Sequence, residues 1–255
     1  MKRKMLSAFV ILLAFAMLLS ACEKPGGTDN TDDNTTDPGN TQGTSVLDAS
    51  VVRMLGHLLV SDTAGRLYSV SVTKSRIYGE NGAAMSPEDL MPGMSVSIKY
   101  KGGIAESYPA QVLNTVSISV TGTETERVSL YFDAVKHIYS EDTALNGMVI
   151  ALDLKGVKSF DSGDKAALQY LLFNEYFSLE ETQVILADSE MLSAQGKIVD
   201  YSYTDGVIIT IEEGESDEFS IKKWRSGDGA VGYTKCKAQH KDGEWQTDYG
   251  EMFIS

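Results

Sequence analysis

The sequence predicts an α+β protein in two parts, a small all-β barrel followed by helices that pack on a curved antiparallel sheet. Three observations lead to this expectation. Apolar residues alternate with polar ones at a period of two through residues 46–122. From residue 124 the period becomes helical, and from residue 206 it returns to that of strands. Helices followed by a run of antiparallel strands are typical of the α+β class.

The chain begins with a segment that has the features of an export signal. Three basic residues precede the apolar residues 5–19, a run shorter than the ~20 residues that a membrane span needs. It ends in Leu19-Ser20-Ala21-Cys22, which resembles the lipobox of bacterial lipoproteins. That resemblance implies a signal peptide over residues 1–21, a lipid on Cys22 and a protein anchored to the outer face of the cell membrane.

A polar tether and a strong negative charge follow from composition. Residues 22–45 consist of the anchored cysteine and a stretch without apolar residues, which cannot bury enough surface to fold. The net charge is −14, and loss of the three basic residues with the signal makes it more negative. Nucleic acid and anionic headgroups are bound through Lys and Arg, so this acidity argues against both partners. It is compatible with a cationic partner, and equally with solubility alone.

The strands of the first part follow from three alternating segments. Between the first two, Ser86 is the expected N-cap of one helical turn, with Pro87 at its first position and Asp89 completing a capping box. Several short strands and one helical turn within about 75 residues predict a small OB-like barrel over residues 46–122. The apolar members of the three segments are Tyr68, Val70 and Val72; Met94, Val96, Ile98 and Tyr100; and Val116, Ile118 and Val120.

This first part resembles a known family. The likeness lies in RLYSVSVTKSRIY and in SPEDLMPGMSVSIKYKGGIAESYPAQVLNTVSI, above all in residues 102–111. These residues resemble a YobA-like family of small extracytoplasmic domains from Gram-positive bacteria, whose function is unknown. The resemblance covers residues 51–120, and it implies a fold and a compartment but no catalytic residue.

Two amphipathic helices are expected early in the second part, residues 124–255. The first has an apolar stripe at i, i+3, i+7 and i+10, as expected of a helix with one buried face. A second stripe follows a polar segment in which Asp161 or Ser162 serves as the N-cap. A third, short helix covers residues 189–195 and is ended by Gly196. The two stripes are Val128, Tyr131, Val135 and Ile138, and Leu168, Leu171 and Leu172.

Strands dominate the remainder of the second part. Residues 206–211 (GVIITI) are almost all apolar, which predicts a strand buried on both faces. Further strands follow, joined by RSGDG and HKDG, which are typical of hairpin turns. A curved sheet wrapped on the first helix, as in a cystatin-like cone, would use these elements economically. Residues 206–255 also resemble C-terminal modules of some Gram-positive sensor peptidases.

Motifs that carry chemistry are few. Residues 227–232 spell G-x-G-x-x-G, but a dinucleotide site needs a helix after the glycines, and a strand is expected here. We interpret the motif as a hairpin. The three histidines lie far apart without a zinc-binding spacing, so we assign no cofactor, metal site or catalytic residue. Cys236 has no partner once Cys22 is lipidated, and we expect it to be packed within a strand.

Two regions are candidates for a binding surface. Trp224, Arg225 and Trp245 lie at the mouth of the expected cone, unless they serve only in sheet packing. Glu106 and Tyr108 precede Pro109, which has no backbone donor and therefore belongs at a sheet edge or at the start of a strand. Glu106 is there either as a backbone cap or as a ligand contact.

These features favour a membrane-anchored surface lipoprotein whose folded part is a non-catalytic binding or interaction module of the cell envelope. Its ligand would be a peptide, a protein or a cell-wall fragment, and its oligomeric state is open. One alternative is an envelope hydrolase that uses carboxylates of the second part, and another is a regulator of a membrane peptidase. A pocket with two inward-facing carboxylates would favour the hydrolase, whereas an apolar or open pocket would favour the binding module.

Overall fold

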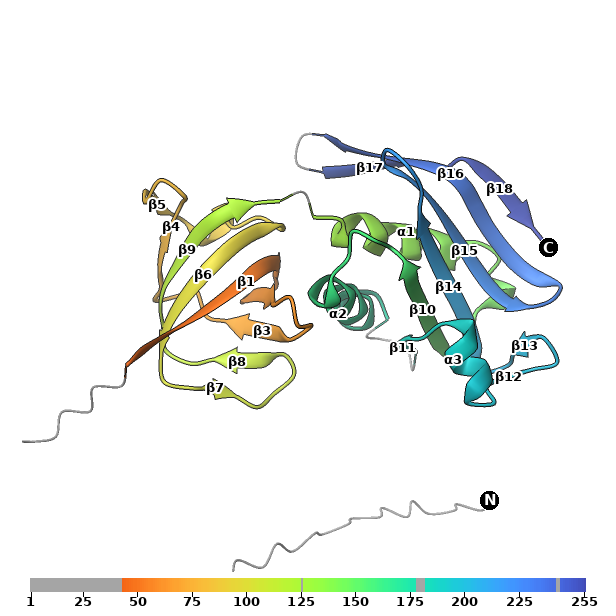
Figure 1. Ribbon diagram of the computed structural model, residues 1–255, viewed down its shortest axis with the longest axis horizontal. Coiled ribbons are helices and arrows are strands. Elements are labelled where there is room, and N and C mark those ends of the chain that lie inside the picture. The colour runs from red at the N-terminus through yellow and green to blue at the C-terminus, as the bar shows by residue number, and fades with distance from the viewer. Residues whose placement is uncertain (1–42, 125, 178–181, 242–243) are drawn as a thin grey trace, which may run out of the picture. The chain divides into compact units, whose positions relative to one another are not determined.

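The computed structural model describes residues 43–255, except for residues 125, 178–181 and 242–243. The expected signal peptide, Cys22 and nearly all of the tether therefore lie outside the described residues. Two sheets and three α-helices form the described part, which confirms the α+β class (Figure 1). None of its helices combines the length and the apolar character that crossing a bilayer requires.

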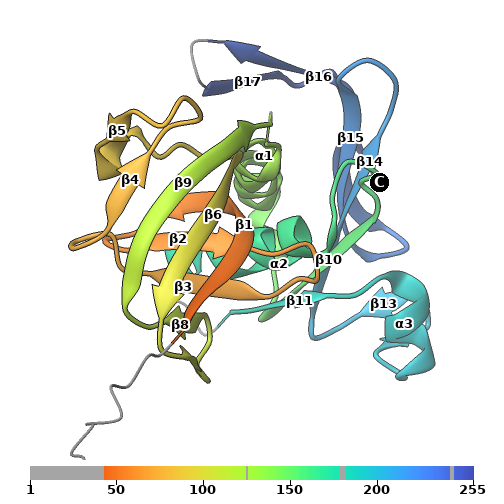
Figure 2. The same ribbon diagram turned by 60° about the vertical axis from the view of Figure 1, so that its left-hand side comes forward.

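The first sheet is curled and has the strand order β5-β4-β9-β6-β1-β2-β3-β8-β7 (Figure 2). The long strand β1 is central to the curl, because it pairs with β6 along its first part and with β2 along its last. A register shift between Val51 and Arg53 marks the change. The strands are β1 (Thr44–Met54), β2 (Leu58–Ser61), β3 (Leu67–Val70), β4 (Arg76–Tyr78), β5 (Ala84–Met85), β6 (Met94–Lys101), β7 (Ile104–Ala105), β8 (Ala110–Val112) and β9 (Thr115–Thr123).

The start of β1 corrects the expected end of the tether. Thr44 and Ser45, which the sequence reading placed in the tether, are paired with Lys101 and Tyr100 of β6. Both residues are exposed, so the backbone ladder and not side-chain burial orders them. Composition alone gives no sign of such a strand end.

The alternating pattern and the helical turn of the first part are confirmed. Val96, Ile98 and Ile118 are almost fully buried, while polar residues occupy the other face of their strands. The turn is the 3₁₀ helix η1 (Pro87–Asp89), where the Asp89 carboxylate accepts a hydrogen bond from the backbone N–H of Ser86 at 2.9 Å. Pro109 immediately precedes β8, near one edge of the sheet, as its missing donor predicts.

The second sheet has the order β11-β10-β14-β15-β13-β12, and β16 pairs with β15, β17 and β18. Its C-terminal strands are antiparallel as expected, but β10 is parallel to both of its neighbours, β11 and β14. This corrects the purely antiparallel sheet that the sequence reading predicted. The strands are β10 (Val149–Gly156), β11 (Gln183–Leu186), β12 (Ile198–Val199), β13 (Ser202–Tyr203), β14 (Gly206–Glu213), β15 (Glu218–Ser226), β16 (Gly229–Lys241), β17 (Glu244–Asp248) and β18 (Glu251–Ile254).

A parallel pair requires a crossover, and a helix supplies it. The chain leaves β10, forms α2 (Ser162–Leu171) and the π-helical turn η3 (Leu172–Tyr176), and later returns as β11. Strand β14 is buried on both faces as predicted. At its first residue, a Cβ would approach the carbonyl oxygen of Val149 to 1.8 Å, so Gly206 is required by the close approach of β10.

The three predicted helices are confirmed. They are α1 (Val128–Ser140), α2 and α3 (Ser189–Ala194). Asp161 is the N-cap of α2, where its side chain accepts from the backbone N–H of Asp164, and the 3₁₀ helix η2 (Thr143–Leu145) follows α1. Gly196 has φ of +69° just after α3, the conformation that ends a helix without cost for glycine.

One apolar cluster joins elements from both parts of the chain. Most of its residues come from α1, α2 and the second sheet, but Val52, Leu59 and Leu67 of the first sheet belong to it as well. Arg53 extends the same contact, because its guanidinium forms an ion pair with Glu175 at 2.6 Å. The rest of the first sheet closes a separate apolar cluster of its own.

The C-terminal strands cover β16 in series. Both β17 and β18 pair with it, and residues Tyr249 and Gly250 separate the two strands. A Cβ at Gly250 would lie 2.3 Å from the carbonyl oxygen of Thr234, and Lys235 opposite has a positive φ of 57°. The glycine motif at residues 227–232 spans the β15–β16 hairpin, as predicted. Cys236 is fully buried and unpaired.

Candidate functional site

A groove of about 680 Å³ lies beside Trp245, one of the predicted site residues. We call it the Trp245 groove. Its walls come from the loop before β6, the segment that leads into α1, the exposed side of α1, and the β16–β17 hairpin. The residues that line it are Met91, Pro92, Met94, Thr123, Glu124, Glu126, Ser129, Asp133, His240, Glu244 and Trp245.

Trp245 is fixed in place by three contacts. Its indole N–H donates to the carbonyl oxygen of Glu126 at 2.7 Å. On β16, its cross-strand partner His240 makes an edge contact at 5.1 Å between ring centroids. The guanidinium of Arg127 lies 5.4 Å from the centre of the indole ring, within the range of a cation–π interaction. The half-buried ring is therefore a rigid element of the groove.

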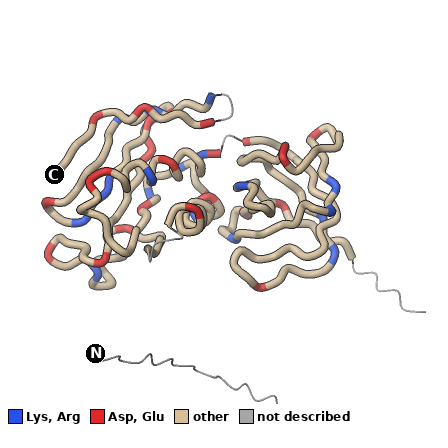
Figure 3. The backbone as a smooth tube through the Cα atoms, turned by 180° about the vertical axis from the view of Figure 1, so that it is seen from behind, with Lys and Arg blue, Asp and Glu red and all other residues tan. Residues whose placement is uncertain are grey.

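The charge of the groove is one-sided. Four carboxylates line it and no Lys or Arg does. Figure 3 shows acidic residues in the segment before α1 and at the start of β17, with basic residues close to them along the chain. Glu126 is used locally, since its carboxylate accepts from the backbone N–H of Ser129 at 3.0 Å, and Asp133 pairs with Lys136 at 3.0 Å. The carboxylates of Glu124 and Glu244 form no hydrogen bond or ion pair with a described residue. Glu244 leaves a carboxylate available to a ligand of the groove, and Glu124 lies between the groove and a second, smaller cavity.

The groove also offers apolar surface. Met91 is 48 % exposed, and Met94 is half-buried. Pro92 lines the groove together with these two methionines. Methionine side chains are flexible and polarizable, and they adapt to irregular apolar partners. Carboxylates, thioethers and an indole ring together suit a ligand that is cationic and partly apolar.

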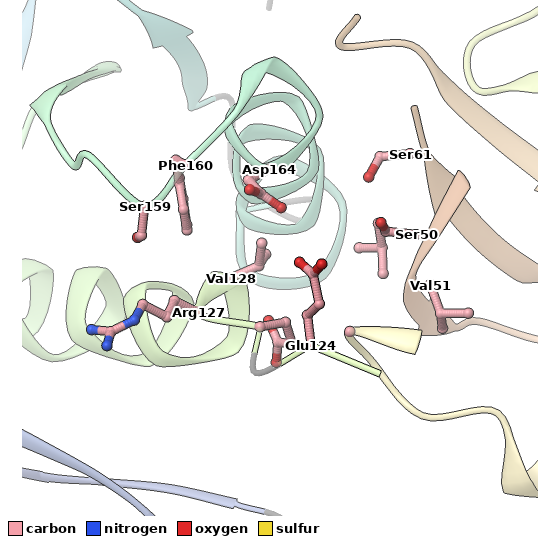
Figure 4. Close-up of a pocket in the computed structure, with 12 residues that line it drawn as sticks. Ser50, Val51, Ser61, Glu124, Arg127, Val128, Ser159, Phe160 and Asp164 are labelled. Atoms are coloured by element: carbon pink, nitrogen blue, oxygen red, sulfur yellow. The ribbon is translucent and has the colours of Figure 1, made fainter. Parts of the chain in front are cut away.

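A smaller, more enclosed cavity of about 110 Å³ lies nearby, and we call it the seam cavity. Figure 4 shows Asp164 and Glu124 facing this space, with Ser50 and Ser61 of the first sheet on its other side. Burial, together with the negative charges of Asp161, Glu126 and Glu124, raises the pKa of the Asp164 carboxyl to about 6. Hydrogen bonding to the Asp161 backbone opposes this rise without cancelling it.

The other predicted site residues are not brought to the Trp245 groove. Trp224 packs beside a small cluster around Leu192 and Tyr203, and its partner on β16 is Ala230. Trp245 pairs with His240 on the same strand, so the two tryptophans are separated by roughly 33 Å along β16 at 3.3 Å per residue. They do not share one mouth, contrary to the arrangement that the cone predicted.

Arg225 has a structural role. Its guanidinium donates to the carbonyl oxygens of Leu145 and Asn146, at 3.2 and 2.9 Å, and to that of Thr204 at 3.3 Å. These bonds satisfy backbone acceptors at the end of helix η2 and in the turn between β13 and β14. Glu106 is exposed, and its side chain forms no hydrogen bond or ion pair with a described residue, whereas Tyr108 lines a different pocket.

Lys223 is a buried cation that the sequence reading did not single out. Its side chain is inaccessible to solvent, and the ammonium lies within hydrogen-bonding distance of the carbonyl oxygens of Tyr139, Glu141 and Asp142 and of the side-chain oxygen of Asn146, which share its three protons. Burial lowers its pKa to about 8. A cation at the carboxyl end of α1 neutralises unsatisfied carbonyls, and its complete enclosure excludes a role as a nucleophile toward solvent-borne substrates.

Comparison with known proteins does not add a relative. No protein-family model, no curated protein and no solved structure matches the chain. Among the described residues, no group of three or more His, Cys, Asp or Glu side chains is arranged to hold a metal ion. The interpretation of the site therefore depends on its own geometry.

Sequence reasoning found Trp245 but missed the rest of the groove. Met91 and Met94 belonged to a predicted strand and its preceding turn, while Glu124 lay at the boundary between the two parts. These residues are about 120–150 positions from Trp245, and only the folded chain brings them together. The surplus of carboxylates in the chain was the available signal.

Proposed function

We propose that this protein is a lipid-anchored surface protein whose folded part binds a cationic, partly apolar partner, most simply a basic segment of a peptide or protein, in the Trp245 groove. One observation carries the proposal: four carboxylates and an immobilised indole line a groove that no Lys or Arg side chain lines. Complementary charge steers such a partner and fixes its orientation, and the indole and thioethers contact its apolar groups.

The cellular context of the proposal comes from the N-terminal sequence. A lipid on Cys22 and a polar tether would hold the folded part at the outer face of the membrane, in agreement with the resemblance to YobA-like extracytoplasmic domains. We further propose that the first sheet is an OB-like barrel, and that α1 and the second sheet are a variant of the cystatin-like cone with a parallel insertion. We do not extend the proposal to hydrolysis. The seam cavity, with about 110 Å³, is smaller than the ~300 Å³ at which small-molecule sites begin.

The anchor is tested at Cys22. Because the thiol is the expected acyl acceptor, Cys22→Ala should leave the chain unprocessed and without lipid. Metabolic labelling with a fatty-acid analogue, followed by mass analysis of the N-terminus, measures both effects. A Cys22→Ala chain that still incorporates the label would contradict the assignment.

The groove is tested with a synthetic peptide that alternates Lys and Leu, in comparison with a peptide of the same length in which Glu replaces Lys. In the Trp224→Phe background, Trp245 is the only tryptophan and reports binding by its fluorescence. The basic peptide should bind and the acidic peptide should not. Removing two rim charges with Glu124→Gln and Glu244→Gln should weaken binding by about 1–2 kcal/mol, roughly tenfold, because exposed pairs contribute up to about 1 kcal/mol each.

The matched control removes two charges elsewhere. Glu88 and Glu215 are exposed and do not line the groove, so Glu88→Gln with Glu215→Gln changes the net charge equally. This double variant should lower the affinity for the basic peptide much less than the groove variant does. Added salt should lower that affinity in all variants. Equal losses of affinity in both double variants would show that the peptide responds to the overall charge of the protein and does not bind in the groove.

A further inference from the structure

A second pocket, separate from the Trp245 groove, lies between the β7–β8 loop, α2 with η3, and the edge strand β11. It has a volume of about 390 Å³, which falls within the ~300–1,000 Å³ of small-molecule sites. No residue lines both this pocket and the groove. We call it the Tyr108 pocket, and it is lined by Tyr108, Gln169, Tyr170, Phe173, Asn174, Gln183, Val184 and Ile185.

Aromatic rings form one side of this pocket and are unusually exposed. Tyr108 is 69 % and Phe173 47 % accessible, although large aromatic side chains are usually covered in a folded protein. Tyr108 meets the ring of Tyr170 edge to face, at 5.8 Å between centroids and an interplanar angle of 74°. Its loop is held by the Ser107 hydroxyl, which donates to the carbonyl oxygen of Pro109 at 2.8 Å. The exposed rings are therefore positioned by local contacts.

Amide side chains supply the polar groups of the pocket. Gln169 donates through its side-chain nitrogen to the carbonyl oxygen of Val184 at 2.8 Å, and Asn174 donates to that of Tyr170 at 2.9 Å. These bonds fix both amides, while no described residue donates to either side-chain oxygen. The exposed amide of Gln183 has no described partner. The pocket thus offers both acceptors and donors to a ligand.

None of the lining residues carries a charge. A phosphate or a nucleotide would need cationic side chains, and a basic peptide would need carboxylates. Strand addition at β11 is hindered, because the outward carbonyl of Val184 is already bonded to Gln169. A ligand that is purely apolar would leave the amides unpaired, at a cost in free energy. The lining therefore suits a neutral molecule with apolar faces and many hydroxyl groups.

We propose that the Tyr108 pocket binds a neutral glycan. The C–H faces of a sugar ring pack on the electron-rich faces of aromatic side chains, and its hydroxyls both donate to and accept from amides. The volume accommodates roughly one or two sugar rings. This inference does not depend on the Trp245 groove, because the two sites share no residue and select for opposite properties, neutrality and positive charge.

The test uses the full chain and neutral trisaccharides of glucose, mannose and N-acetylglucosamine as probes, with isothermal titration as the measurement. At least one trisaccharide should bind at millimolar concentration or below, and its affinity should be independent of salt, since neither the sugar nor the lining of the pocket is charged. Tyr108→Ala and Phe173→Ala should each weaken binding about tenfold or more, as expected for aromatic contacts at the centre of a site.

Tyr201→Ala is the matched control, because Tyr201 is 83 % exposed but does not line the pocket. It should leave the affinity unchanged, and all three variants should keep the unfolding transition of the parent. Failure of every trisaccharide to bind would overturn the proposal. So would binding that Tyr108→Ala and Phe173→Ala reduce no more than Tyr201→Ala does. Neither Tyr108→Ala nor Phe173→Ala should change the affinity for the Lys-Leu peptide, because neither residue lines the Trp245 groove. The two proposals can therefore fail independently.

Discussion

At the scale of single residues, Asp164 is the clearest example of a side chain under conflicting demands. Its carboxylate accepts from the backbone N–H of Asp161 at 3.1 Å, and its own N–H donates to the Asp161 side chain at 2.9 Å. This capping box stabilises the start of α2. The same carboxyl faces the seam cavity with Glu124 and Glu126 nearby, and burial with negative charge raises its pKa to about 6.

The raised pKa makes stability depend on pH. The unfolded chain has the ordinary pKa of 3.8, so between pH 4 and 6 the folded state binds more protons, and stability falls as the pH rises through this window. Asp164→Asn keeps an acceptor for the Asp161 N–H but removes the charge. Only the wild type then loses stability as the pH rises. We therefore expect the free energy of unfolding of the variant, relative to that of the wild type, to increase by about 1–2 kcal/mol from pH 4 to pH 7.

Denaturant unfolding at pH 4, 5, 6 and 7 measures this gain. Asp228→Asn is the control, because Asp228 is exposed in the β15–β16 turn. A constant difference between Asp164→Asn and the wild type over this range would show that Asp164 does not titrate there. A loss of stability at every pH would instead assign it a purely capping role.

At the scale of elements, local signals predicted the helices and the antiparallel strands but not the parallel ones. The apolar stripes of α1 and α2 and the cap at Asp161 are properties of neighbouring residues, so they can be seen in the sequence. Strand β10 has a short apolar run that is equally compatible with a buried helix, and β11 is only four residues long. Their identity depends on pairing with each other and with β14.

The candidate sites divide in the same way. Trp245 and Tyr108 stand out in the sequence because they are aromatic and close to turns. Tyr170 and Phe173 do not stand out in the sequence, because they belong to a helical segment for which the sequence analysis considered only the residues that face the core. Arg225 was predicted at a surface and instead supports the backbone after η2, since carbonyls near it have no other donor in the described contacts. A site formed by distant segments is visible only in the fold.

At the scale of the whole molecule, the question is whether the two sheets fold independently. Each has an apolar cluster of its own, which favours independence, but Val52, Leu59 and Leu67 contribute to the cluster of the second part. We expect fragments 44–123 and 124–255 each to unfold cooperatively, and both at a lower temperature than the joined chain, because separation exposes this shared surface.

Thermal unfolding followed by circular dichroism measures the three transitions. The full chain without residues 1–21 is the reference. If neither fragment shows a cooperative transition while the reference does, the predicted boundary at residues 122–124 does not separate folding units. If both fragments melt at the temperature of the reference, the contact made by the three shared residues contributes nothing to stability.

The position of β10 in its sheet has a kinetic consequence. Strand β10 is the first strand of the second sheet to be synthesised, yet its two neighbours begin only at Gln183 and Gly206. Until both have been made, its hydrogen-bonding groups have no native partner on either side. Such non-local pairing slows folding, because long loops close before their contacts form. The second sheet therefore stays open for as long as its chain is incomplete.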